Sequence, residues 1–183
     1  QNANATTHVG INMEVCSGYI VEENSFILSQ QPNSSASKWG IITNNSGSAP
    51  NQIYKNYFTN INYGNVSIGV NRNNSIVNSI GLQYLCNENS SNYNFDFYVS
   101  NKGGANVGIR SFQGTSTYPA QNTFSHTGPA SLYTDFNNTS NTPLNYYFQP
   151  PLAPLYYNSP LVNPISVQVS IPVLHTFVHR HVI

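Results

Sequence analysis

The stretch that decides the fold reads FDFYVSNKGGANVGI and spans residues 95–109. Apolar side chains occupy every second position of 95–99, which is typical of a strand with one buried face. A second alternating segment begins at residue 107, and Asn-Lys-Gly-Gly at 101–104 supplies turn residues between the two. Two alternating segments joined by so short a Gly-rich turn predict a β-hairpin, and therefore an antiparallel sheet.

The rest of the chain has the same strand-like composition. Val, Ile, Thr and aromatic residues number 63, against 37 strong helix formers (Ala, Leu, Glu, Lys, Gln, Arg and Met), and no window has sustained helical periodicity. Residues 113–164 hold eight of the eleven prolines and predict long ordered loops with short strands. No internal repeat is recognised. The further predicted strands lie at 7–15, 19–21, 26–28, 39–43, 53–58, 66–70, 76–85 and 165–173. The predicted fold class is therefore all-β, an immunoglobulin-like or pilin-like antiparallel β-sandwich.

Charged residues are scarce. Asp, Glu, Lys and Arg supply only 12 of 183 residues, or 7%, where about 25% is usual, and the formal net charge is zero. Nucleic acids and anionic membrane surfaces require clustered Lys and Arg, so both are excluded as partners. A hydrophobic fraction of 39% argues against disorder. No membrane span is predicted, because the apolar stretches alternate with polar residues.

Polar uncharged residues provide the surface instead. The chain has 29 Asn and 34 Ser plus Thr but only three Lys, so an AT-rich genome, which enriches Lys alongside Asn, is a poor explanation. Carboxylates are largely protonated at about pH 2–3 whereas Asn, Ser and Thr stay polar, so an acidic exterior favours this composition. A polar β-protein in a neutral extracellular medium is the alternative. Both interpretations predict an extracellular location.

Two further features suit a secreted chain. The acceptor pattern for N-linked glycans, Asn-x-Ser/Thr, occurs eight times, where chance gives about five. The cysteines, Cys16 and Cys86, predict one disulfide that closes a long loop, with two free buried thiols as the alternative. Apart from N-linked glycans, no cofactor is expected. The predicted glycosylation sites are Asn4, Asn33, Asn44, Asn65, Asn73, Asn89, Asn137 and Asn138.

Catalytic and metal-binding patterns are absent or weak. The chain has no Gly-x-Ser-x-Gly, phosphate-loop or His-Glu-x-x-His motif, and a Ser-x-x-Lys match at 35–38 lies in a Ser-rich turn. Glu22 and Glu23 are adjacent, and neighbours on a strand point to opposite faces. Three C-terminal histidines would share one face of an unbroken strand, yet no Cys or carboxylate lies nearby in sequence, so no metal site is predicted. They are His175, His179 and His181. The chain is not expected to be an enzyme.

Long alternating segments occupy the two ends of the chain. Residues 7–15 predict a nine-residue strand about 30 Å long, and residues 165–183 predict another that ends without a polar tail. An ordinary sandwich holds both in its own sheets. Alternatively, residues 1–15 form a donor-strand arm that completes the sheet of the next subunit, and residues 16–183 form the head domain. Such a head-to-tail contact does not close and so produces a filament. The donated side chains would be Val9, Ile11, Met13 and Val15.

The chain resembles the thread filament subunit of thermoacidophilic archaea in its alternating N-terminal segment, β-rich head, ion-poor surface and many glycosylation patterns. The resemblance is one of organisation and composition over the whole chain. It implies a secreted, glycosylated pilin similar to bacterial chaperone–usher pilins, with an immunoglobulin-like head completed by the N-terminal strand of a neighbour. Residues 7–15 would be that donor strand. Gly10 departs from the bacterial pattern, since it lies on the opposite face from Val9 and Ile11.

The leading hypothesis is a structural subunit of an extracellular, glycosylated, pilus-like filament that serves adhesion or biofilm formation. Its partners would be copies of itself, joined head-to-tail by donor-strand complementation. The alternative is a carbohydrate- or receptor-binding β-domain, such as an adhesin head, a viral fibre, or a capsid or surface-layer protein. The 13 Tyr and Trp39 could stack on sugars, although Tyr equally suits core and loop packing.

Overall fold

Short strands joined by tight corners make up most of the chain. The structure, a computed structural model, describes residues 6–29, 36–104, 106–127 and 132–168. The strands are β1 (Thr6–Glu14), β2 (Ile20–Glu22), β3 (Ser25–Ile27), β4 (Ala36–Asn44), β5 (Gln52–Tyr54), β6 (Tyr57–Thr59), β7 (Tyr63–Ile68), β8 (Gln83–Leu85), β9 (Glu88–Ser90), β10 (Phe95–Val99), β11 (Phe112–Gln113), β12 (Phe136–Asn138), β13 (Leu144–Phe148) and β14 (Val162–Ser166). Every pairing between these strands is parallel.

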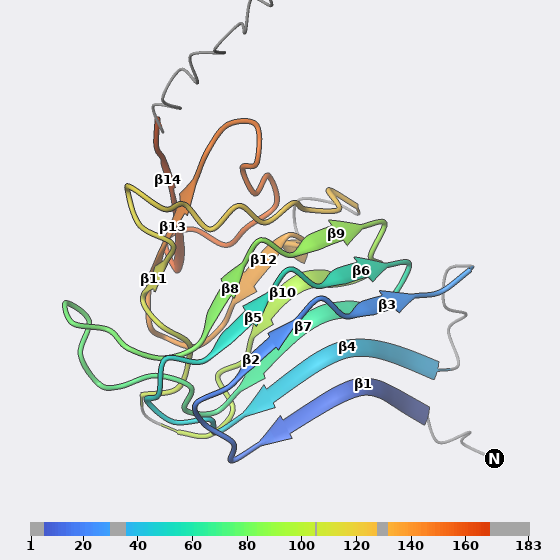
Figure 1. Cartoon of the computed structure of the whole chain (residues 1–183), viewed down its shortest axis with the longest axis horizontal. Coiled ribbons are helices and arrows are strands. Elements are labelled where there is room, and N and C mark those ends of the chain that lie inside the picture. Colours follow the sequence, from blue (N-terminus) through green and yellow to red (C-terminus); the bar gives the residue numbers. More distant parts are fainter. Residues whose placement is uncertain (1–5, 30–35, 105, 128–131, 169–183) are drawn as a thin grey trace, which may run out of the picture.

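The strands stack into a parallel β-solenoid (Figure 1), in which each of the first three coils adds one strand to each of three sheets, and β10 and β12 then extend the largest sheet alone. The largest sheet has the order β1-β4-β7-β10-β12, and it is accompanied by β2-β5-β8 and β3-β6-β9. Val21 pairs with Ile53, and Ile53 pairs with Tyr84, so these coils are displaced by 32 and 31 residues (53 − 21 and 84 − 53). A fourth sheet, β11-β13-β14, lies at the C-terminal end of the stack (Figure 1).

This parallel arrangement contradicts the predicted antiparallel, immunoglobulin-like sandwich. β10 pairs in parallel with β7 and β12, and residues 101–104 form a corner of the coil instead of a hairpin turn. Both glycines of this corner have positive φ, a conformation that suits a solenoid corner as well as a hairpin. Val107 and Ile109 are buried, but the glycine between them bridges in parallel to Val70 of the preceding coil.

A ladder of asparagines holds the coils in register. Asn56 Oδ1 accepts hydrogen bonds from the main-chain N–H and the side-chain amide of Asn24, both at 3.0 Å. Asn87 Oδ1 accepts the corresponding pair of hydrogen bonds from the main-chain N–H and side-chain amide of Asn56. Asn122 Oδ1 accepts the corresponding pair from Asn87. The residue before each ladder asparagine has a φ between 53° and 59°, so every coil turns this corner with one left-handed residue followed by Asn. The ladder thereby satisfies main-chain groups that the corner would otherwise leave buried without partners.

A column of glycines lies in the large sheet, where its strands bend (Figure 1). Register places Gly10 of β1 beside Gly40 of β4, and Gly40 beside Gly64 of β7. A Cβ atom at Gly40 would lie 2.5 Å from Cε1 of Phe58, and Gly10 meets the ring of Phe26 in the same way. The two rings stack with centroids 5.2 Å apart. Glycine is required at positions 10 and 40 because the aromatic rings of the facing sheet occupy the space of a side chain.

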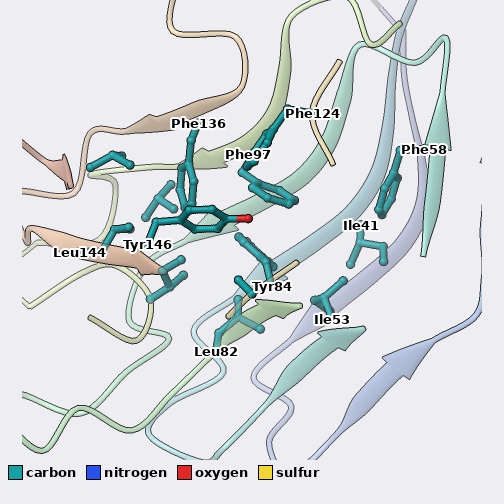
Figure 2. Close-up of a cluster of buried hydrophobic side chains, with 14 of the residues drawn as sticks. Ile41, Ile53, Phe58, Leu82, Tyr84, Phe97, Phe124, Phe136, Leu144 and Tyr146 are labelled. Carbon is teal, nitrogen blue, oxygen red and sulfur yellow. The ribbon is translucent and has the colours of Figure 1, made fainter. Parts of the chain in front are cut away.

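Apolar side chains fill the interior of the solenoid (Figure 2). The rings of Tyr84 and Phe97 stack with centroids 4.9 Å apart, and Phe136 meets Phe97 edge to face at 5.3 Å. Ile41 and Ile53 are fully buried beside them. Each such side chain contributes roughly 1.5–3 kcal/mol through the burial of apolar surface. The core is continuous across the coils, so no coil could bury its apolar face alone.

Candidate functional site

The predicted donor strand belongs to the fold of its own chain. β1 pairs in parallel with β4, with Ile11 beside Ile41 and Met13 beside Thr43. Ile11 packs against the core of the same chain, and Met13 is also half-buried. Val9 and Val15 are exposed, and Val15 has a left-handed φ of 52° just beyond the strand. The described part of residues 1–15 is therefore the first strand of the solenoid, not an arm separate from residues 16–183.

The first coil leaves one end of the solenoid open. β1, β2 and β3 are each the terminal strand of their sheet, so one edge of each has no strand partner among the described residues. We refer to these three edges as the N-terminal face. Phe26 and Val21 are only half-buried there, whereas the equivalent Phe58 and Ile53 of the second coil are completely buried. The face therefore exposes interior apolar positions together with unpaired strand edges, a combination that favours strand addition.

The opposite end is covered by the chain itself. Phe136 of β12 bridges in parallel to Tyr157, and the main-chain N–H of Asn138 donates to Asn158 Oδ1 at 2.8 Å. Asn138 donates in turn to the carbonyl of Leu161 at 3.0 Å. The two ends of the solenoid thus differ, and a second coil could not simply stack on the C-terminal end.

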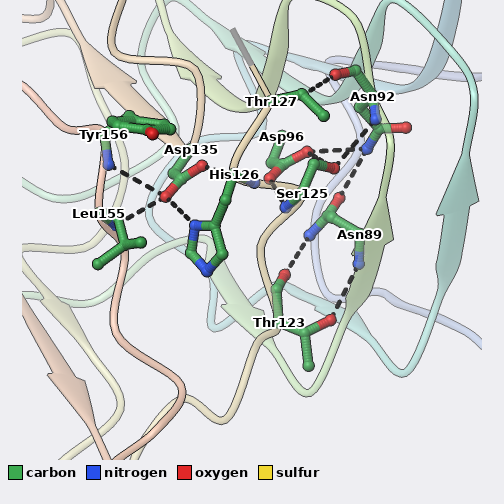
Figure 3. Close-up of polar contacts among 10 residues, drawn as sticks. All are labelled: Asn89, Asn92, Asp96, Thr123, Ser125, His126, Thr127, Asp135, Leu155 and Tyr156. Atoms are coloured by element: carbon green, nitrogen blue, oxygen red, sulfur yellow. Dashed lines mark hydrogen bonds and ion pairs between the residues drawn. The ribbon is translucent and has the colours of Figure 1, made fainter. Parts of the chain in front are cut away.

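A buried carboxylate cluster lies in the third and fourth coils (Figure 3). Asp96 is fully buried and accepts hydrogen bonds from the main-chain N–H of Ser125 at 2.6 Å, from its hydroxyl at 2.7 Å and from the amide of Asn92 at 2.9 Å. Burial raises the pKa of Asp96 to about 7, although these hydrogen bonds act in the opposite direction. Asp96 occupies the register position that Gly64 holds one coil earlier. The glycine column therefore ends at this acid.

A second carboxylate, that of Asp135, connects two loops through hydrogen bonds. Asp135 Oδ2 accepts the main-chain N–H groups of Leu155 at 2.7 Å and Tyr156 at 3.1 Å, and it lies 2.7 Å from Nδ1 of His126. Asp135 is fully buried, whereas the His126 side chain is 37% exposed (Figure 3). A carboxylate that orients an imidazole is also part of hydrolytic triads. Among the described residues no hydroxyl or thiol hydrogen-bonds to His126, and the contacts of Asp135 connect His126 to the segment 155–156.

The cysteines do not form the predicted disulfide. Cys16 is an exposed thiol that donates to the Glu14 carbonyl at 3.2 Å, and Cys86 is a half-buried thiol. Cys16 precedes β2 in the first coil, whereas Cys86 follows β8 two coils later. Two strand spacings are about 9.5 Å, which exceeds the Cα separation of about 4.4–6.8 Å that a disulfide spans. Burial raises the pKa of the Cys86 thiol.

Burial divides the predicted glycosylation sites. Asn65, Asn89 and Asn138 are at most 4% exposed, so the prediction of a glycan at these three positions is wrong for the folded chain. Asn44, Asn73 and Asn137 are partly exposed and remain predictions. Asn4 and Asn33 lie outside the described residues.

Several other predicted features can be located only in part. His175, His179 and His181 lie outside the described residues, and within those residues no group of three potential metal ligands occurs. Glu22 lies in β2, whereas Glu23 has a left-handed φ and lies 4.0 Å from Lys55 Nζ.

The described part of the chain contains no helix long and apolar enough to cross a membrane.

The asparagine ladder shows that the expectation of no internal repeat is wrong, and the sequence contains a signal for it. Asn-x-Phe occurs at 24–26, 56–58 and 122–124, and Asn-x-Asn occurs at the intermediate position, 87–89. This spacing of 31 to 35 residues is typical of a solenoid repeat. The signal is weak because nothing else in the coils is repeated as strictly.

No protein-family model, curated protein or solved structure matches the chain.

Proposed function

We propose that this protein is a structural subunit of an extracellular filament, in which each copy adds a strand to the N-terminal face of the next. The observation that carries the proposal is the half-exposed interior of the first coil. Phe26 and Val21 occupy positions that the second coil buries completely. One added strand along β1 would pair its free edge and extend the large sheet beside Ile11, which packs against the core.

The donor in this proposal is the C-terminal segment, residues 169–183, of a neighbouring copy. β1 cannot serve as donor, because it is part of its own solenoid. Residues 169, 171 and 173 are Val, Ile and Val, which places three branched apolar side chains on one face of an extended strand. Fifteen extended residues span about 50 Å, more than the roughly 30 Å of β1. β14, which precedes the segment, lies at the far end of the stack from β1, so donation of residues 169–183 to the N-terminal face of another copy would give a head-to-tail chain (Figure 1).

The sequence of the donor suits the edge that it would create. Pro172 lacks a main-chain N–H and is tolerated at the outer strand of a sheet but not at a central one. The added strand would be the terminal strand of the large sheet, where such a residue fits. The immunoglobulin-like head implied by the resemblance to archaeal thread pilins is wrong, so the proposal rests on the N-terminal face and not on that family.

The extracellular location is supported by composition. Twelve charged residues among 183 and a neutral formal charge favour a polar surface that changes little with pH. Adhesion or biofilm formation is the predicted role of such a filament, and Asn44, Asn73 and Asn137 are the described positions where a glycan could project.

The proposal is tested by the size of the assembled protein. Analytical ultracentrifugation of the full chain should show oligomers that grow with concentration, and the double variant Ile171→Asp/Val173→Asp should remain monomeric. Ser170→Asp adds a carboxylate on the opposite face of the same segment and should assemble as the unmodified chain does. An excess of the synthetic peptide 169–183 should shorten the oligomers, because it would occupy the N-terminal face. A chain that stays monomeric at all concentrations, or variants that assemble equally, would contradict the proposal.

A further inference from the structure

A cavity of about 490 Å³ lies on the outer side of β5 and β8, where the loop 114–121 folds over them. We refer to it as the Arg110 cavity. Its volume falls in the range of about 300–1,000 Å³ that small-molecule sites occupy. The residues that matter for the argument are Tyr54, Gln83, Cys86, Arg110, Tyr118 and Gln121.

The loop that closes the cavity is held by its own hydrogen bonds. Thr115 donates its main-chain N–H to the Tyr118 carbonyl at 2.8 Å, and the Tyr118 N–H donates to Thr115 Oγ1 at 2.9 Å. Gly114 and Pro119 form an antiparallel bridge at the base of this turn. A ligand would therefore meet a wall that is already formed, which lowers the entropy cost of binding.

Arg110 is a cation that has no anionic partner within the described part of the chain. Its Nη1 donates to Gln83 Oε1 at 2.6 Å, and Gln83 Nε2 is itself fixed by the Phe112 carbonyl at 3.1 Å. The Nε atom is buried and has no hydrogen-bond partner among the described residues. No Asp or Glu lines the cavity, and the two ion pairs of the described chain lie elsewhere, at Lys55–Glu23 and His126–Asp135. Burial lowers the pKa of Arg110, yet a guanidinium stays charged in proteins.

We propose that the Arg110 cavity binds a sugar acid, with the carboxylate of the ligand at the Arg110 guanidinium. A planar guanidinium matches a carboxylate in shape and charge. The remaining walls fit a hydroxyl-bearing ring, because Tyr54 and Tyr118 present aromatic surface while Gln121 and the loop threonines offer hydrogen-bond donors and acceptors. A bare inorganic anion would use Arg110 alone and leave most of the cavity unfilled.

The test compares glucuronate, glucose and sulfate as probes in a titration of the full chain followed by amide NMR. Glucuronate should shift the signals of residues 83–86 and 110–121 saturably, and glucose, which lacks the carboxylate, should bind at least tenfold more weakly. Arg110→Gln should weaken glucuronate binding at least tenfold. Lys102→Gln removes the same charge from an exposed turn outside the cavity and should change binding less than twofold.

Two further measurements distinguish a loss of glucuronate binding from a folding defect. Tyr118 is 78% exposed, so Tyr118→Ala should leave the fold intact while weakening glucuronate binding several-fold. Glucuronate should also slow alkylation of the cavity thiol Cys86 and leave the exposed Cys16 unaffected. The proposal is overturned if no probe gives a saturable response, if Arg110→Gln binds glucuronate as the unmodified chain does, or if sulfate binds as tightly as glucuronate.

Discussion

Asn87 Oδ1 accepts two hydrogen bonds from Asn56, one from its main-chain N–H at 3.1 Å and one from its side-chain amide at 3.2 Å, across the spacing between two coils. Asn87 in turn donates to the carbonyl of Ile53 at 2.9 Å and to Asn122 Oδ1 at 3.1 Å. A single buried side chain thus connects three coils. The stability of the solenoid should depend on it more than on any surface asparagine.

Replacing Asn87 by Ala should destabilise the chain by about 3 kcal/mol, because several buried donors and acceptors lose their partners at once. Urea unfolding followed by circular dichroism measures the change. Asn74→Ala, at an exposed position, is the matched control and should change the free energy of unfolding by less than about 0.5 kcal/mol. A loss below 1 kcal/mol for Asn87→Ala would show that the ladder is not a main determinant of stability.

Replacing Gly40 by Ala should prevent normal packing within the second coil and against the third. The added Cβ would lie 2.5 Å from a ring carbon of Phe58 and 2.6 Å from the Gly64 carbonyl oxygen, and the latter belongs to backbone that cannot move aside. We expect a loss of about 2–4 kcal/mol on thermal or urea unfolding. The double variant Gly40→Ala/Phe58→Ala relieves the ring contact but not the backbone contact. A fully neutral Gly40→Ala would mean that the strands do not bend over Phe58.

Stability should fall as the pH rises, because of Asp96. The pKa of this buried carboxyl is raised to about 7 in the folded chain, whereas an unfolded Asp titrates near 4. The folded state therefore holds a proton that the unfolded state releases between about pH 4 and 7. The contribution is fully present below pH 4, declines over that interval and is lost above about pH 7.

Urea midpoints between pH 4 and 8 measure this effect, which should amount to a few kcal/mol. Asp96→Asn should flatten the profile, since the amide carries no titrating proton. Glu88→Gln removes an exposed carboxylate and should leave the slope unchanged. A profile for Asp96→Asn as steep as that of the unmodified chain would assign the pH dependence to other groups.

The positions of most strands could be predicted from the sequence, but their direction could not. The predicted strand 39–43 lies within β4, and the alternating segment 95–99 forms β10. Alternation reports only that one face of a strand is buried, and it is the same in parallel and antiparallel sheets. The Gly-rich corner at 101–104 suits a hairpin and a solenoid equally, so the local chemistry favoured the wrong topology.

The candidate sites depended on that topology. The pairing of Cys16 with Cys86 followed from counting cysteines, and only the placement of the coils shows that they lie two strand spacings apart. Of the four side chains that the alternation of residues 7–15 assigned to a neighbour's core, Ile11 packs against the core of its own chain, whereas Val9 and Val15 are exposed. The Arg110 cavity brings together residues from three separate segments, and no local pattern indicates such a site.

Amide hydrogen exchange at β1 tests most directly whether copies join through the N-terminal face. Exchange at Thr6–Glu14 is compared between dilute and concentrated protein, with the central strand β7 as the internal reference. Strand addition predicts that protection of β1 rises at least tenfold with concentration, that β7 does not change, and that Ile171→Asp/Val173→Asp abolishes the rise. Protection of β1 that is the same at every concentration would contradict assembly through this face.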